Sequence, residues 1–261
     1  MSVLDKIVRQ KEQEVSRLKS ENNAAEMKRM AYQSTDCRDL VQALKNCPHA
    51  PVIAEIKRFS PSEGSIREVE DVGILAALYQ KGGAAALSVL TDEPFFGGRP
   101  IDLENARSAV DLPVLRKDFI IDPVQLYESR IIGADAVLLI AAALDAMVLD
   151  DLYREARELG MTPLVEVHSA EELDQVLKLD PAIVGVNNRN LKTFEVNLET
   201  CMDLRRMVPP ETIVVGESGI KEPQDIVMLR RAGIDAFLIG TSLMKSPDPA
   251  LALKMLCAAG V

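Results

Sequence analysis

A carboxylate and an ammonium group stand two residues apart in an otherwise apolar stretch within the first quarter of the chain. Residues 51–57 read PVIAEIK, with Glu55 and Lys57 near the carboxyl end. Strand side chains alternate between faces, so these two would point the same way, about 7 Å apart. Burying both charges costs free energy unless they are paired or used in a reaction. The pair therefore indicates either a buried salt bridge or general acid–base chemistry.

Four later apolar stretches carry polar side chains at the same end. Lys117 closes PVLRK, Glu166 lies in PLVEV, Asn187 closes IVGVN and Glu217 closes TIVVGE. A protonated lysine can donate a proton to a reacting oxygen, and a carboxylate can accept one. Burying so many charged groups for stability alone is costly. We therefore favour an active site over a structural charge network.

These residues lie on apolar segments that alternate with amphipathic segments from residue 51 onward. The expected strands are residues 51–57, 86–91, 113–119, 136–141, 163–167, 183–189, 212–218 and 236–241. The expected helices are residues 69–82, 123–133, 146–160, 170–179, 198–208, 222–233 and 249–260, and the crossover 95–111 has the weakest helical pattern. Eight such units predict an α/β fold, the (β/α)8 TIM barrel. The alternative, a doubly wound open sheet, usually carries a GxGxxG loop after its first strand, and residues 51–64 contain none.

The active site of such a barrel lies at the carboxyl ends of its strands, which is where the polar residues stand. Alternation along each strand sorts them further. If Lys117 faces the interior, Arg116 and Asp118 face away from it and pair behind it. By the same rule Asn187 and Arg189 share a face, unless a β-bulge intervenes.

Residues 1–48 differ from the rest of the chain, and we expect the barrel domain to cover residues 49–261. Apolar residues recur on one helical face of this N-terminal extension, among them Leu4, Ile7 and Val15. Such a helical extension either caps one mouth of the barrel or forms a frayed amphipathic tail. The residue pattern leaves both alternatives open.

Composition limits the classes of partner. The net charge of −10 argues against nucleic acid or an anionic membrane as the main partner. The four cysteines form no CxxC pair and there are two histidines, so we expect free thiols and no metal. The N-terminus has no signal-peptide core, and no run of 18 apolar residues exists, so we expect a cytoplasmic protein. We expect a monomer, with an oligomer as the alternative.

Small residues follow the last two expected strands. GESGI at 216–220 and IGTS at 239–242 place Ser218, Gly219, Gly240 and Thr241 where backbone N–H groups can approach an anion. Barrels often bind phosphate after their seventh and eighth strands. The sequence thus predicts a small phosphorylated molecule as the substrate.

The chain resembles the indole-3-glycerol phosphate synthase family over nearly its whole length. The motifs that carry the resemblance are IAEIKRFSPSEG, LSVLTDEPFFGG, PVLRKDF, LVEVHSAEEL, GVNNRNL, GESGI and LIGTSLM. The resemblance implies a barrel with a helical N-terminal segment near the active-site mouth. It also implies closure of the indole ring of 1-(2-carboxyphenylamino)-1-deoxyribulose 5-phosphate, with loss of CO₂ and water and without a cofactor or metal.

The resemblance also assigns catalytic roles. It implies that Lys117 is the general acid for the substrate carbonyl. Lys57 would pair with the anionic groups of the substrate and is a candidate second acid. Glu166 would act as base or proton partner in the dehydration, and Glu55 is a further essential carboxylate. Carboxylates near Lys117, such as Glu55 and Glu166, would counter the lowering of its pKa by burial.

The remaining site residues would bind the substrate. Asn187 and Arg189 match residues that bind its polar groups. Asn187 is also a catalytic candidate, and so is Ser218. Glu217 would contact the substrate. The phosphate cradle would consist of Ser218, Gly219, Gly240 and Thr241. Residues near the lid or along the aryl ring would be Ser60, Pro61, Phe96, Phe119, Leu138 and Leu191.

The departures from the family pattern are small. Val124 stands on an expected helix where an aromatic residue is common, and Thr241 stands where serine is common. We expect His168 at the rim or behind the site. Two rival functions remain open: another phosphate-binding barrel, such as a phosphoribosylanthranilate isomerase or a tryptophan synthase α-type lyase, and a barrel that binds a phosphorylated metabolite without turnover.

Overall fold

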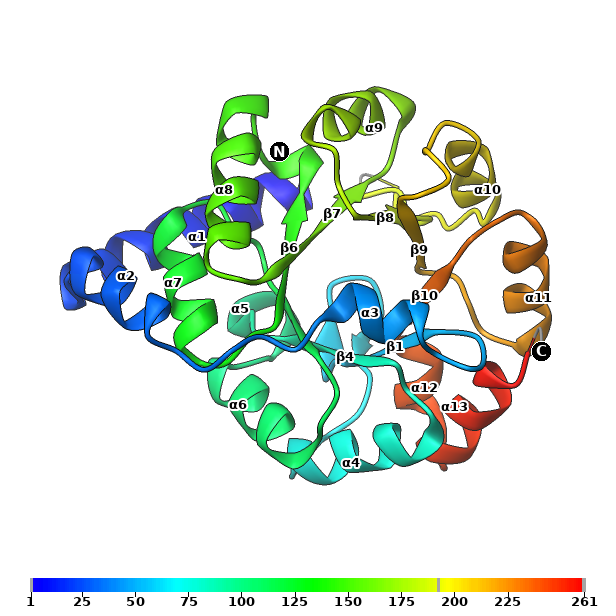
Figure 1. Cartoon of the computed structure of the whole chain (residues 1–261). Helices are drawn as coiled ribbons and strands as arrows, with labels where there is room; N and C mark the ends of the chain where they lie inside the picture. The colour runs from blue at the N-terminus through cyan, green and yellow to red at the C-terminus, as the bar shows by residue number, and fades with distance from the viewer. Residues whose placement is uncertain (1, 192, 260–261) are drawn as a thin grey trace.

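The computed structural model describes residues 2–191 and 193–259. Within them, eight parallel strands close into a barrel in the order β1-β10-β9-β8-β7-β6-β5-β4, ringed by helices (Figure 1). The barrel strands are β1 Val52–Ile56, β4 Ala86–Leu90, β5 Val114–Lys117, β6 Ala136–Ile140, β7 Thr162–Val167, β8 Ile183–Asn187, β9 Ile213–Glu217 and β10 Ala236–Ile239. The predicted (β/α)8 barrel is confirmed.

The helices of the barrel follow their strands along the chain. They are α4 Val72–Gly82, α5 Glu93–Phe96, α6 Pro100–Ala109, α7 Pro123–Ile131, α8 Ala146–Glu158, α9 Ala170–Val176, α10 Glu199–Arg205, α11 Pro223–Arg231, α12 Thr241–Lys245 and α13 Pro249–Cys257, with 3₁₀ turns η1 Ala141–Ala143 and η2 Leu177–Leu179. Residue 260, the expected end of the last helix, lies outside the described residues.

Apolar residues on both faces of each strand explain why the sheet closes. Ile53, Leu115 and Leu164 belong to the core inside the barrel, whereas Val52 and Ala54 belong to the larger core between strands and helices. Full burial of one such aliphatic side chain contributes about 1.5–3 kcal/mol. Because neighbours along a strand enter different cores, the register that places Lys117 inside is fixed by packing.

The structure shortens several expected strands, and three differences bear on the site. The crossover 95–111 forms two helices, α5 and α6, because Gly97 ends α5 at a φ of +65°. The sixth barrel strand ends at Asn187 rather than at residue 189. The eighth ends at Ile239, because Gly240 is the N-cap of α12 and Thr241 begins that helix.

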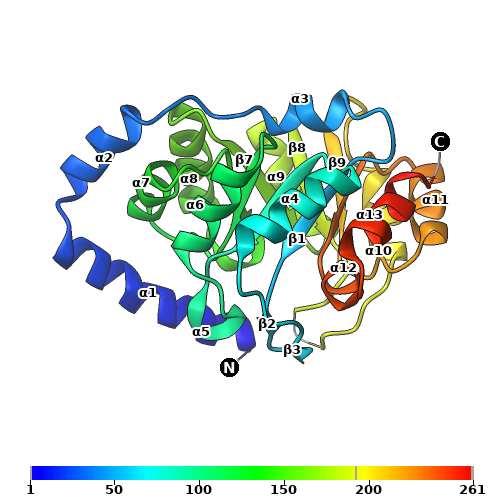
Figure 2. The ribbon, with the colours of Figure 1, turned by 90° about the horizontal axis from the view of Figure 1, so that it is seen from below.

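The N-terminal segment spans the outside of the barrel from one end to the other. It consists of α1 Val3–Glu21, α2 Ala24–Tyr32 and α3 Leu40–Lys45. Figure 2 shows α1 on the side of α5 and of the hairpin formed by β2 Phe59–Ser60 and β3 Gly64–Ser65, with α3 at the opposite end. Leu40 and Leu44 of α3 pack against the inner core of the barrel. The division into domains at residue 48 stays a prediction.

The described residues show two further properties. All four cysteines are free. Within the described ranges, no helix is long and apolar enough to cross a membrane.

Candidate active site

A cavity of about 690 Å³ opens at the carboxyl ends of the barrel strands. The structure brings every predicted site residue to its lining. These residues are Glu55, Lys57, Ser60, Pro61, Phe96, Lys117, Phe119, Leu138, Glu166, Asn187, Arg189, Leu191, Glu217, Ser218, Gly219, Gly240 and Thr241. Their arrangement, described below, determines what chemistry the cavity can support.

Lys117 lies between two buried carboxylates at the centre of the cavity. Its Nζ is 2.6 Å from Glu217 Oε2 and 3.1 Å from Glu166 Oε2. We expected Glu55 and Glu166 as its neighbours, but Glu217 is nearer than Glu166. Burial alone would lower the pKa of Lys117, but Glu217, Glu166 and Glu55 outweigh burial and raise this pKa above its ordinary value. The lysine is therefore a cation that can donate a proton.

The two carboxylates differ in their affinity for protons. Burial raises the pKa of Glu217, and the nearby Glu166 raises it further, although Lys117 opposes both effects. The pKa of Glu166 is well below its ordinary value, because Lys117, His168 and Asn187 outweigh the effect of burial. Environments that separate the pKa values of neighbouring acids commonly set acid and base roles.

Glu166 is held in place by groups from the next strand and from its own. Asn187 donates a hydrogen bond from Nδ2 to Glu166 Oε1 at 3.2 Å. His168 Nε2 lies 3.3 Å from the same oxygen, and its Nδ1 lies 3.3 Å from Glu172 Oε2. Burial would lower the pKa of His168, but the two glutamates raise it to about 10. His168 thus lies behind Glu166, outside the cavity lining.

Glu55 and Lys57 form a second charged pair on β1 and just beyond it. Lys57 Nζ lies 2.6 Å from Glu55 Oε1. A Cβ on Gly240 would overlap this same carboxylate oxygen, so only a glycine leaves room for Glu55 at this point. Gly185 has the same relation to Glu217 Oε1. Gly240 directly after β10 and Gly185 on β8 therefore make space for two of the buried acids.

The predicted phosphate cradle lies after β9 and β10. Ser218 and Gly219 have positive φ angles of +61° and +86°, which form a tight turn at the mouth. Ser242 donates a hydrogen bond from Oγ to the carbonyl of Ile220 at 3.1 Å and so joins the two loops. The cradle residues border one continuous surface of the cavity.

The β2–β3 hairpin covers part of the mouth. Ser60 and Pro61 line the cavity from this hairpin, and Ser60 Oγ accepts the N–H of Glu63 at 3.2 Å. Glu63 forms an ion pair with Lys245 of α12 at 2.8 Å and lies 3.9 Å from Arg189. Sequence patterns did not single out Glu63 or Lys245, since these two residues are 182 positions apart in the chain and only the fold brings them together.

Apolar residues form the opposite wall. The rings of Phe96 and Phe119 lie 5.9 Å apart, within the range of aromatic pairs. Val3, Leu4 and Ile7 of α1 complete this wall, whereas Val196 and Leu198 line the cavity beside Gly219 of the phosphate cradle. The sequence left open whether the N-terminal extension caps the barrel. The apolar face that holds Leu4 and Ile7 was the feature that pointed to this contact.

The charges behind Lys117 follow the alternation of β5. Arg116 Nη2 lies 3.1 Å from Asp118 Oδ2, as predicted for the face opposite Lys117. Among the described residues, no group of three or more potential metal ligands is present.

Comparisons with known proteins agree with this geometry. A family model described as indole-3-glycerol phosphate synthase matches residues 4–256. The chain is 46% identical to the indole-3-glycerol phosphate synthase of Rhodopirellula baltica, over 99% of this chain and 100% of that protein. It is 48% identical to the enzyme of that name from an Acidovorax species, over 98% of this chain and 99% of the relative.

A solved structure supports the architecture. Thiamine phosphate pyrophosphorylase from Pyrococcus furiosus matches with a TM-score of 0.59 and 16% identity, over 84% of this chain and 96% of that chain, which is a likeness of fold alone. The family model and the two relatives, in contrast, extend along nearly all of the sequence. The chain belongs to the indole-3-glycerol phosphate synthase family.

Proposed function

We propose that this protein converts 1-(2-carboxyphenylamino)-1-deoxyribulose 5-phosphate into indole-3-glycerol phosphate, with release of CO₂ and water. The observation that carries the proposal is Lys117, a buried cation between Glu166 and Glu217 at the centre of a cavity at the strand ends. A general acid must keep its proton while water is excluded, and the two carboxylates provide that condition.

The first step forms the carbon–carbon bond. The ring carbon that bears the carboxyl group attacks the sugar carbonyl, whose oxygen takes a proton from Lys117 and becomes a hydroxyl. The bond to the carboxyl group then breaks, CO₂ leaves, and its electron pair restores the aromatic ring. Such a step gains most from holding the reacting atoms in a near-attack geometry.

The second step removes the new hydroxyl as water. An acid protonates this hydroxyl, and the lone pair of the ring nitrogen drives its departure as water. A base then removes one proton from the CH₂ carbon next to the nitrogen, and the electrons of that C–H bond form the double bond of the indole. We assign the base to Glu166, whose low pKa keeps it ionised. Lys57 is a further cation of the cavity lining, and we assign it the anionic groups of the substrate and a supporting acid role.

The other lining residues bind and orient the substrate in this proposal. Asn187 and Arg189 bind its polar groups, and Ser218 with Gly219, Gly240 and Thr241 holds the phosphate. The aryl ring lies along the wall made by Phe96, Phe119, Leu138, Pro61 and Leu191. Ser60 acts from the β2–β3 hairpin that covers part of the mouth. Glu55 holds Lys57 in position through their ion pair.

This reaction is that of a carbon–carbon lyase, a carboxy-lyase of tryptophan biosynthesis. Its chemistry needs neither a metal nor a cofactor. The partner that we propose is the small phosphorylated substrate. We propose that the chain acts as a monomer in the cytoplasm.

The test is direct turnover. The purified protein should produce indole fluorescence from the carboxyphenylamino substrate, and the chain itself contains no tryptophan to obscure that signal. Conversion of phosphoribosylanthranilate instead would favour the isomerase-type rival. Tight binding of the carboxyphenylamino substrate without product would favour the non-catalytic rival, and either result would contradict the proposal.

A further inference from the structure

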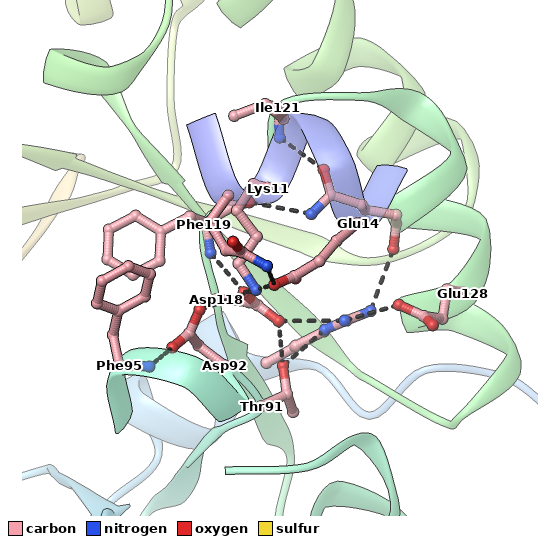
Figure 3. Close-up of polar contacts among 12 residues, drawn as sticks. Lys11, Glu14, Thr91, Asp92, Phe95, Asp118, Phe119, Ile121 and Glu128 are labelled. Atoms are coloured by element: carbon pink, nitrogen blue, oxygen red, sulfur yellow. Dashed lines mark hydrogen bonds and ion pairs between the residues drawn. The ribbon is translucent and has the colours of Figure 1, made fainter. Parts of the chain in front are cut away.

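Lys11 of α1 is buried among three carboxylates. Its side chain is 3% exposed, and its Nζ lies 2.8 Å from Glu14, 2.9 Å from Asp92 and 2.8 Å from Asp118. Figure 3 shows Lys11 reaching from α1 between Asp92 and Asp118. A fully buried lysine is rare unless it is paired, so this contact is a built feature of the fold.

The two aspartates belong to two different strand-end loops. Asp92 is the N-cap of α5, where its side chain accepts the N–H of Phe95 at 2.8 Å. Asp118 directly follows Lys117, and its Oδ1 accepts the N–H of Phe119 at 2.8 Å. Thr91 donates a hydrogen bond to the other oxygen of Asp118 (Figure 3). Arg116 donates a second hydrogen bond to the same oxygen. Lys11 therefore ties α1 to both loops at once.

Each of the three connected segments contributes to the apolar wall of the cavity. The α5 segment carries Phe96, the loop after β5 carries Phe119, and these rings face each other. Helix α1 carries Ile7, four residues before Lys11 and so one turn away on the same side of the helix. The position of this wall thus depends on a single shared cation.

Electrostatics supports a strong dependence on that cation. Burial would lower the pKa of Lys11, but Asp118 and Asp92 outweigh burial and raise it. Burial raises the pKa of Asp92, which Lys11 opposes and Asp118 reinforces. Without Lys11, Asp118 would keep Arg116, but the buried carboxylate of Asp92 would lose its cation and face Asp118, which destabilises the contact between the two loops.

We propose that Lys11 is a positioning residue for the aryl-binding half of the cavity, because it holds α1, α5 and the loop after β5 together. The identity of the aryl ligand rests on the proposed function. The phosphate cradle after β9 and β10 lies on strands that neighbour neither β4 nor β5. Lys11 should therefore affect binding of the aryl group without affecting binding of phosphate.

The experiment compares two ligands in Lys11→Met. Indole-3-glycerol phosphate is titrated through its own fluorescence, and inorganic phosphate is measured by its inhibition constant in displacing that ligand. We expect the dissociation constant of indole-3-glycerol phosphate to rise by about tenfold, which corresponds to about 1.4 kcal/mol. The inhibition constant of phosphate should stay within about twofold of wild type.

Three further variants separate positioning from loss of fold. Asp92→Asn removes the opposite charge of the same contact while asparagine remains a good N-cap, and it should reproduce the effect. Lys11→Arg should restore most of the affinity. Lys19→Met is the matched control. Lys19 lies on the same helix as Lys11 and pairs with Asp122 at 2.6 Å, but its position is exposed.

The outcomes distinguish the two proposals. Equal weakening of both ligands, or no weakening of either in Lys11→Met and Asp92→Asn, would overturn the positioning role. If the wild-type protein turns over the substrate but these variants match it, the proposed function stands and Lys11 is only structural. If the wild-type protein neither binds indole-3-glycerol phosphate nor turns over the substrate, both proposals fail.

Discussion

Replacing Lys117 with methionine removes a proton donor and, at the same time, the cation between two buried acids. The side chain is 13% exposed, and those of Glu166 and Glu217 are 4% and 2% exposed. Methionine keeps the length and apolar stem of lysine, so the substitution changes charge more than volume. The same change therefore predicts a loss of activity and a loss of stability.

Each loss has an expected size. General acid catalysis contributes about 10²–10⁴-fold, so the activation barrier should rise by about 3–5 kcal/mol. Breaking a buried ion pair by removing one partner costs about 3–5 kcal/mol of stability. In the variant, Glu166 keeps His168, but Glu217 has lost its cation, so burial and Glu166 raise the folded-state pKa of Glu217 further above that of the unfolded chain. The loss of stability is then smallest at acid pH, where Glu217 is protonated in both states, and grows as pH rises toward that raised value.

The assay combines product fluorescence with thermal unfolding at pH 5 and pH 8. Lys117→Met should show a loss of turnover of at least 10²-fold and a melting temperature further below wild type at pH 8 than at pH 5. Lys254→Met, a change at an exposed lysine of α13, is the matched control and should alter neither property. Turnover of Lys117→Met within tenfold of wild type would refute the assignment of Lys117 as the acid.

Three other substitutions test separate parts of the site. In Gly240→Ala the new Cβ displaces Glu55, and because misplacement by about 1 Å can cost about 10²-fold, a similar fall in kcat is expected; unchanged kinetics would contradict this close approach. His168 has a folded-state pKa of about 10 against 6.5 as its ordinary value, so the stability it adds over His168→Asn is full below pH 6.5 and disappears as pH rises toward 10. Denaturant unfolding at three pH values measures this difference in stability between the two proteins. A difference that grows as pH rises would contradict the prediction. The exposed pair of Glu63 and Lys245 should contribute about 0–1 kcal/mol, so Glu63→Gln should speed product release by at most about fivefold and lower its dependence on salt. Stopped-flow release that is slower, or whose dependence on salt is unchanged, would show that this pair does not hold the β2–β3 hairpin over the mouth.

The barrel and the ring of polar residues were predictable from local patterns. On the condition that Lys117 faces the interior, strand alternation placed the Arg116–Asp118 pair behind it, because each strand contributes a short, regular segment. The ends of the strands were less predictable. Thr241 begins a helix rather than ending a strand, since Gly240 breaks the sheet pairing at that point.

Contacts between distant segments explain what the sequence did not reveal. Lys11 lies between Ile7 and Val15 on the apolar face of α1, but the pattern of the helix gives no sign of the carboxylates that it meets. Its partners Asp92 and Asp118 lie far along the chain, and only the closed barrel brings them to α1. In the same way, Glu217 proved to be the carboxylate nearest to Lys117, because the closing of the barrel places β9 across from β5.

The most direct test of the central claim is a crystal structure with a substrate analogue whose carbonyl is reduced to a hydroxyl. The account predicts that this hydroxyl lies within about 3 Å of Lys117 Nζ, with the phosphate at Ser218, Gly219, Gly240 and Thr241 and the aryl ring against Phe96 and Phe119. An analogue bound with its hydroxyl beyond hydrogen-bond reach of Lys117, or with phosphate and ring in exchanged places, would contradict it.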